Sequence, residues 1–107
     1  MTDVPKIADI LERIDRIERA TVGGMDVFLA SEVIQDAVIR NLEVIGEAAK
    51  GISESTRRHN PKVPWREMAR FRDLAIHQYG RVRAEEVWEI VENELPAIRR
   101  SLAHMKQ

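Results

Sequence analysis

Apolar residues recur along most of this 107-residue chain with the spacing of one helical face, and no segment shows the strict alternation of a half-buried strand. In the first such segment they follow the i, i+3, i+4, i+7 pattern, with charged residues between them. Because an α-helix completes a turn every 3.6 residues, this pattern predicts helices with a buried stripe. The predicted helices cover about residues 7–21, 26–50, 65–77 and 84–105. Short loops between them favour an all-α, antiparallel four- to five-helix up-and-down bundle.

Glycine and proline residues mark the predicted helix ends. Gly24 follows the first helix, and Gly51 is placed to stop the second. Pro64 suits the first position of the third helix, where its missing N–H is not needed. Pro96 is expected to kink the final helix because it removes a backbone hydrogen bond.

The length of the chain limits it to one hydrophobic core, so residues 1–107 are predicted to form a single domain. It contains no cysteine, which excludes disulfides and thiolate chemistry and is compatible with a reducing compartment. No basic leader with an apolar run is seen, and no stretch approaches the roughly 18 apolar residues of a membrane span. We therefore expect a cytoplasmic protein with no membrane partner.

Charge is unevenly distributed along the chain, although the net charge is only -1. Residues 1–56 hold 11 acids and 6 Lys or Arg, residues 57–83 hold 2 acids and 8 Lys or Arg, and residues 84–107 hold 5 and 3. The middle segment is a candidate phosphate-facing patch, although charge alone favours a solvated, salt-bridged face. Its cations are Arg57, Arg58, Lys62, Arg66, Arg70, Arg72, Arg81 and Arg83.

The third predicted helix carries the most informative motif, Arg72-x4-His77-x-Tyr79. It follows the sequence Asn60-Pro61-x-x-Pro64-Trp65 and a helix containing Arg-Asn-Leu-Glu-Val-Ile-Gly-Glu-Ala-Ala over residues 40–49. With these features in this order, the chain resembles the HepT-like family of the HEPN superfamily along nearly its whole length.

The resemblance implies the toxin of a toxin–antitoxin system, a homodimeric endoribonuclease that needs no metal and no cofactor. Arg72 and His77 would be its catalytic residues, at a cleft where two protomers bring their motifs together. The resemblance also implies that an MntA-like nucleotidyltransferase antitoxin silences the toxin by attaching AMP to Tyr79.

The chemistry of these residues suits RNA cleavage without a metal. Such cleavage requires activation of a ribose 2′-OH, protonation of the leaving 5′-oxygen and stabilisation of negative charge on the phosphorane. A histidine titrating near neutrality transfers protons, and an arginine holds phosphate oxygens bidentately. On a regular helix, Arg72 and His77 would point roughly 140° apart. Either the helix ends near His77 and redirects it, or a second protomer completes the pair.

Arg66, Arg70, Asp73 and His77 share one helical face, which makes Arg66 and Arg70 candidate RNA phosphate contacts. Asp73 departs from the commoner family pattern, which has an amide at this position. Its carboxylate could orient His77, or it could occupy Arg72 and repel phosphate.

Two other interpretations remain open. In the first, the chain is an inert helical adaptor or nucleotide-binding partner of a nucleotidyltransferase, and the motif holds that partner or a nucleotide. Without the resemblance, His77 would be a helix cap and Arg72 would pair with Asp73 or Glu67. In the second, the bundle binds RNA without cutting it. Replacing His77 by alanine separates both from the ribonuclease.

The remaining candidate residues favour structural roles. Trp65 and Trp88 are expected in the core, and Glu43 and Glu47 are expected to pair with arginines at a helix interface. No His or Glu spacing is typical of a metal site, so no metal is expected. The broad apolar stripe of 26–50, with small residues near its end, suits packing inside the bundle or across a dimer.

Overall fold

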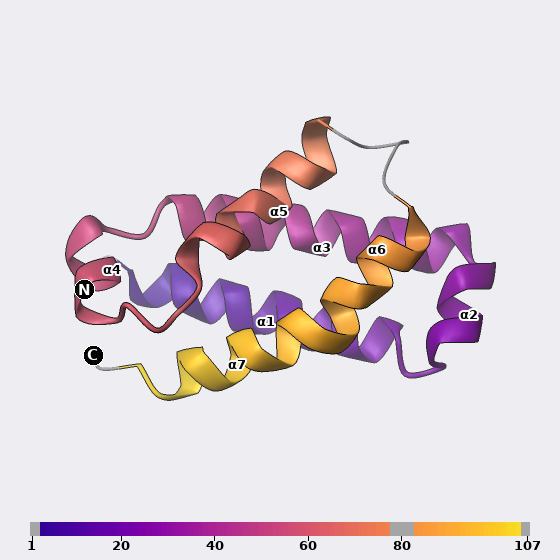
Figure 1. Cartoon of the computed structure of the whole chain (residues 1–107), viewed down its shortest axis with the longest axis horizontal. Helices are drawn as coiled ribbons and strands as arrows, with labels where there is room; N and C mark the ends of the chain where they lie inside the picture. Colours follow the sequence, from indigo (N-terminus) through magenta and orange to yellow (C-terminus); the bar gives the residue numbers. More distant parts are fainter. Residues whose placement is uncertain (1–2, 78–82, 106–107) are drawn as a thin grey trace.

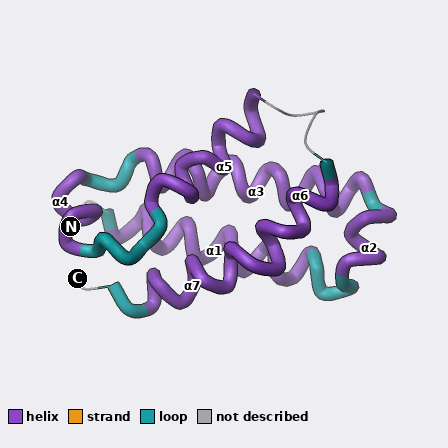
Figure 2. Tube along the Cα trace, in the orientation of Figure 1, coloured by secondary structure: helices purple, strands orange, loops and turns teal. Residues whose placement is uncertain are grey.

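The computed structural model describes residues 3–77 and 83–105, and within them all regular structure is helical. Figures 1 and 2 show the helices joined by short loops. The predicted all-α bundle is confirmed. In chain order the elements are α1 (Val4–Ala20), α2 (Met25–Ala30), α3 (Glu32–Lys50), α4 (Glu54–His59), α5 (Trp65–His77), α6 (Ala84–Glu89), the π-helical segment η1 (Ile90–Glu94) and α7 (Leu95–Ala103).

Helix α3 is the central element of the bundle, because it packs against both α1 and α5. Figure 1 shows α1 and α3 lying side by side, with α5 crossing α3 and α7 running along α1. The two ends of the chain lie at the same end of the molecule, next to α4.

The core is built from the predicted apolar stripes. Ile10, Ile14 and Ile17 of α1 are fully buried, and so are Met68 and Phe71 of α5. The other elements add buried residues to the same cluster, and removing this apolar surface from water is the main force that holds the bundle together. These residues are Phe28, Val38, Leu42, Ile45, Ala49, Ile52, Val63, Trp65, Val87, Ile90, Leu95, Ile98 and Leu102.

The prediction of one continuous helix over 26–50 is wrong, because the chain turns out of the helical conformation at Ser31. Ser31 has φ −125° and ψ 107°, and its hydroxyl accepts a hydrogen bond from the Ile34 N–H at 3.1 Å. The Gln35 amide donates to the carbonyls of Phe28 and Leu29 at the end of α2. Side chains thus satisfy the backbone groups that a continuous helix would have paired.

The predicted helix over 84–105 is interrupted by a wider turn and not by a break. The segment η1, Ile90–Glu94, has π-helical geometry and leads directly into α7, where Pro96 lies in the first turn. A proline inside a helix cannot donate to the carbonyl four residues earlier, and a wider turn at this point accommodates the missing bond. The irregularity therefore lies just before Pro96.

One glycine and both tryptophans have the structural roles that the sequence predicts. Gly24 has φ +87°, a conformation that favours glycine, and it separates α1 from α2. The indole of Trp65 is buried and donates to the Asn60 carbonyl at 3.0 Å. Trp88 is partly buried, and its ring centroid lies 5.3 Å from that of Phe28. Both tryptophans are core residues, as predicted.

Candidate active site

The candidate site is built where α5 crosses α3, and Gly46 makes this crossing close. A Cβ atom on Gly46 would lie 2.3 Å from the backbone nitrogen of Arg72 and 2.7 Å from its Cβ. No larger residue fits there without moving α5 away from α3. The predicted close approach of a helix at the end of 26–50 therefore occurs inside the bundle, and it fixes the place of Arg72.

The Arg72 guanidinium lies beside two carboxylates without a close bond to either. Its Nε is 3.8 Å from Oε1 of Glu47, and its Nη1 is 4.0 Å from Oδ1 of Asp73. Both distances exceed the 2.7–2.9 Å of a charge-assisted hydrogen bond. Among the described residues the guanidinium makes no hydrogen bond, and its side chain is 32% exposed. Its donors therefore remain available to a phosphate.

Asp73 is hydrogen-bonded to α3. Its Oδ1 accepts a hydrogen bond at 2.9 Å from Nζ of Lys50, the last residue of α3. The predicted pairing of Arg72 with Asp73 is thus present only as a long contact, while no contact between Arg72 and Glu67 is seen among the described residues. The prediction that Glu43 and Glu47 pair with arginines at a helix interface is confirmed for Glu47, which contacts Arg72 of α5. It is wrong for Glu43, which contacts Arg40 of its own helix at 3.2 Å.

Helix α5 is described as far as His77, and the residues that follow it, 78–82, lie outside the described part of the chain. Both solutions to the 140° spacing therefore stay predictions. The side chain of His77 and the whole of Tyr79 lie outside the described residues, so their predicted roles stay predictions.

Arg70 and Arg72 contact different carboxylates. Arg70 lies 3.8 Å from Oε1 of Glu94 on η1, on the side of α5 that faces α6 and η1. A groove of about 430 Å³ there contains Arg70 and Arg83 but also four glutamates, Glu85, Glu86, Glu89 and Glu94. Because these glutamates repel a phosphate, the groove around Arg70 is less suited to bind one than the surroundings of Arg72. Arg66 has no ion-pair partner in the described part of the chain.

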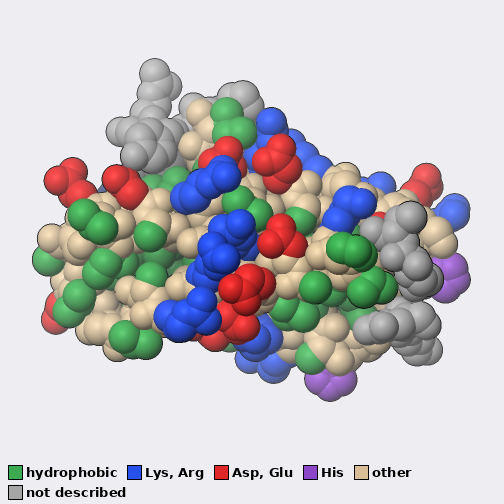
Figure 3. All heavy atoms as spheres, turned by 180° about the vertical axis from the view of Figure 1, so that it is seen from behind, with side chains coloured by type: hydrophobic (Ala, Val, Ile, Leu, Met, Phe, Trp, Pro, Cys, Tyr) green, Lys and Arg blue, Asp and Glu red, His purple; other side chains and the backbone are tan. Residues whose placement is uncertain are grey.

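Part of the basic segment is a salt-bridged surface. Arg58 contacts Glu54 at 3.8 Å, and Arg83 contacts Glu85 at 3.9 Å. On the reverse face of the molecule, acidic and basic side chains lie intermixed in a band across the middle (Figure 3). Charges of both signs are therefore mixed on this face.

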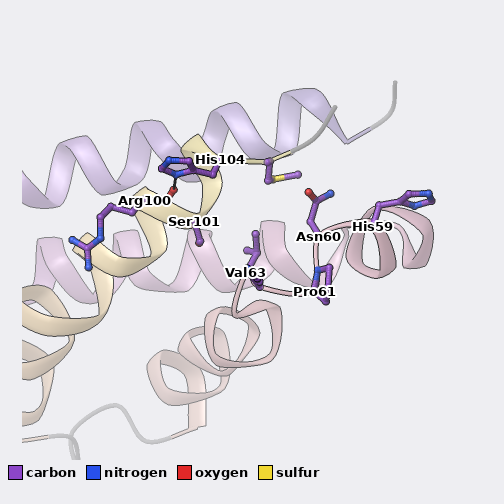
Figure 4. A pocket seen from close by; sticks show the side chains of 9 residues that line it. His59, Asn60, Pro61, Val63, Arg100, Ser101 and His104 are labelled. Carbon is purple, nitrogen blue, oxygen red and sulfur yellow. Dashed lines mark hydrogen bonds between the residues drawn. The ribbon is translucent and has the colours of Figure 1, made fainter.

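A second hollow, of about 720 Å³, lies between the α4–α5 loop and the end of α7 (Figure 4). It includes His59 and His104, whose Nδ1 atoms lie 2.8 Å from the carbonyls of Ser55 and Arg100. Because a carbonyl only accepts, each Nδ1 carries the proton. Figure 4 shows the two imidazoles well apart and not facing each other, so they form no acid–base pair.

Within residues 3–77 and 83–105, no group of three or more acidic or histidine side chains is gathered as a metal site would require. None of the helices in this described part is both long and apolar enough to cross a membrane.

The helical bundle and the arginine five residues before a histidine on α5 agree with the class of proteins to which the family match assigns the chain, the HEPN superfamily. Within it, the family described as "Ribonuclease HepT-like" matches residues 10–105, and the chain belongs to this family.

Several curated proteins are similar to most of the chain. "Probable ribonuclease HepT" of Thermococcus cleftensis is 43% identical over 87% of this chain and 86% of its own length. A protein of Methanocaldococcus jannaschii named "Putative RNase" is 46% identical over 82% of this chain and 74% of its own. Another of that name, from Caldanaerobacter subterraneus, is 34% identical over 99% and 96%. No solved structure matches the chain.

Proposed function

We propose that the chain is a metal-independent endoribonuclease, the toxin of a toxin–antitoxin system, with Arg72 and His77 as its catalytic residues. The observation that carries the proposal is the state of Arg72. Its backbone is fixed against Gly46, while its guanidinium makes no hydrogen bond to any described residue. A cation that is placed by the fold but not hydrogen-bonded is suited to bind a phosphate.

In the proposed reaction, Arg72 holds the non-bridging oxygens of the phosphate and stabilises the charge that develops there. His77 moves protons between the ribose 2′-OH and the leaving 5′-oxygen. Arg66 and Arg70 would contact phosphates further along the strand, with Arg70 partly neutralised by Glu94. The match of the ribonuclease family over residues 10–105 supports this assignment.

The proposal includes a homodimer, because one chain supplies a single copy of the motif. Residues 1–107 would act as one domain, and two copies would face each other across a cleft at the end of α5. The absence of cysteine is compatible with the cytoplasm, where the RNA substrate is found.

The proposed partner that silences this toxin is an MntA-like nucleotidyltransferase antitoxin. It would attach AMP to Tyr79, which is two residues after His77. A nucleotide at this position would add negative charge and bulk at the cleft, and both would exclude RNA. Its support is the resemblance of the motif to that of the family.

The alternative is an inert adaptor or nucleotide-binding partner of the nucleotidyltransferase. Its specific support is the pair of carboxylates, Glu47 and Asp73, that lie within 4.0 Å of Arg72. If either closed on the guanidinium, phosphate would have to displace it.

The test is cleavage of total RNA in EDTA by purified protein whose intact mass shows Tyr79 unmodified. We expect the parent to cut, and the Arg72→Ala and His77→Ala variants to lose at least about 100-fold in rate. His104→Ala is the matched control, because His104 lies on the exposed end of α7 and should leave cutting unchanged.

Each other outcome has a clear meaning. No cutting by unmodified parent would favour the adaptor, and RNA binding without cutting would favour the binding-only bundle. Cutting that EDTA abolishes would contradict the metal-independent mechanism.

A further inference from the structure

Lys50 stands at the α3–α5 crossing, opposite the residue that follows the motif arginine. Its Nζ lies 2.9 Å from Oδ1 of Asp73, and that same oxygen lies 4.0 Å from Nη1 of Arg72. One carboxylate oxygen thus lies between two cations and is hydrogen-bonded to only one of them. The lysine holds the bond that the arginine would otherwise take.

We propose that Lys50 is a positioning residue: it holds the Asp73 carboxylate and so leaves the Arg72 guanidinium available to phosphate. This inference rests on the proposed ribonuclease function. An arginine and a carboxylate in reach of each other form a strong bidentate pair. Without the ammonium of Lys50, Asp73 would keep Arg72 within reach, because Nη1 of Arg72 lies 4.0 Å from the same carboxylate oxygen, and the negative charge of Asp73 would be less balanced and would repel the substrate.

The packing of the two helices makes this role specific to Lys50. Gly46 lets α5 approach α3 so closely that the end of α3 lies opposite Asp73. The side chains of Lys50 and Asp73 are 42% and 50% exposed. Surface ion pairs of this kind add little to stability, so a variant at Lys50 should remain folded while its chemistry changes.

The first test compares cleavage rates in a double-mutant cycle. We expect Lys50→Gln to lower kcat/KM about five- to tenfold, mainly through KM, because Asp73 then competes with phosphate for Arg72. In the Asp73→Asn background the same change should have no effect, and Lys50→Arg should keep the parent's rate. Lys6→Gln, on α1, removes the same charge and is the matched control.

The second test needs no catalysis and uses inorganic phosphate as the probe. The Nε–H signal of Arg72 is followed by NMR while phosphate is added to each variant. We expect the Lys50→Gln variant to need about five times more phosphate than the parent for half the shift. In the Asp73→Asn background, Lys50→Gln should not change the amount of phosphate needed for half the shift.

The two tests separate this inference from the function on which it rests. If the parent does not cut RNA, the proposed function fails, and the phosphate titration still decides the role of Lys50. If the parent cuts and Lys50→Gln matches it in both tests, the inference is wrong. It is also wrong if the loss persists in the Asp73→Asn background, or if Arg72 in the parent does not respond to phosphate.

Discussion

At the scale of single residues, Asp3 shows how one buried carboxylate joins two helix ends that are 50 positions apart in the chain. It precedes α1 and accepts hydrogen bonds from the Ser53 hydroxyl at 2.6 Å, the Ser53 N–H at 3.2 Å and the Thr56 hydroxyl. Hydrogen bonds to an ionised carboxylate favour that form, so those from Ser53 and then Thr56 lower the pKa of Asp3 below its usual 3.8.

This gives a prediction with a defined pH window. Because the folded pKa of Asp3 is lowered, its stabilising effect is complete above pH 3.8 and is lost as the pH falls through the folded value. We expect Asp3→Asn to lower Tm at pH 5 to 7, and the gap to the parent to close in more acidic solution. Thermal unfolding followed by circular dichroism between pH 3 and pH 7 measures this difference in Tm.

The control for this prediction is Asp9→Asn. Asp9 is 47% exposed and contacts Arg13 only at 3.7 Å, so Tm should change little at any pH. A difference for Asp3→Asn that stayed constant down to pH 3 would assign its effect to lost packing and not to the charge.

At the scale of the helices, Gly46 determines how α3 and α5 meet. Alanine is the better helix former by about 1 kcal/mol. At this position, however, its methyl group would lie 2.3 Å from the backbone of Arg72, which cannot move by rotating a side chain. We expect Gly46→Ala to lower the free energy of unfolding by about 1–3 kcal/mol and to lower RNA cutting more than stability alone explains. Urea unfolding and cleavage assays measure the two effects.

Gly51, which directly follows the last residue of α3, offers a matched control. Its added methyl group would meet the far end of the flexible Lys6 side chain, at 2.9 Å, and its φ of −87° suits any residue. Gly51→Ala should therefore be nearly neutral in both assays. Equal losses in the two variants would contradict the role given to Gly46.

The helices also show why the sequence predicts only part of this structure. The buried faces of the long helices follow from periodicity, which is local. The break at Ser31 does not, because apolar residues continue across it and the Gln35 amide that satisfies α2 belongs to the next helix. Likewise, the motif places Arg72, but its contact with Gly46 and the Lys50–Asp73 pair depend on how two helices cross.

At the scale of the whole molecule, the apolar stripe that suggested a dimer is largely used inside the protomer. Val38, Leu42 and Ile45 of α3 are fully buried in the chain's own core. A dimer therefore has to use apolar residues that the core leaves exposed. Ile76 is 40% exposed beside His77, whereas Val22 is 84% exposed in the α1–α2 turn, away from the motif. A cleft shared by two motifs would bury Ile76 and leave Val22 exposed to water.

The proposed cleft thus makes a prediction that separates these two surfaces. We expect the parent to have twice the 12.3 kDa mass of one chain at micromolar concentration. Ile76→Lys should raise the dissociation constant of this dimer about tenfold or more, since an isoleucine buried in an interface contributes about 1.5–3 kcal/mol. RNA cutting should fall in parallel. Val22→Lys should change neither the dimer nor RNA cutting.

Sedimentation and cleavage at matched concentrations measure these effects, and a fully active monomer would rule out a shared cleft. If Val22→Lys alone broke the dimer, the interface would lie at the α1–α2 end, and the two motifs would have to work separately.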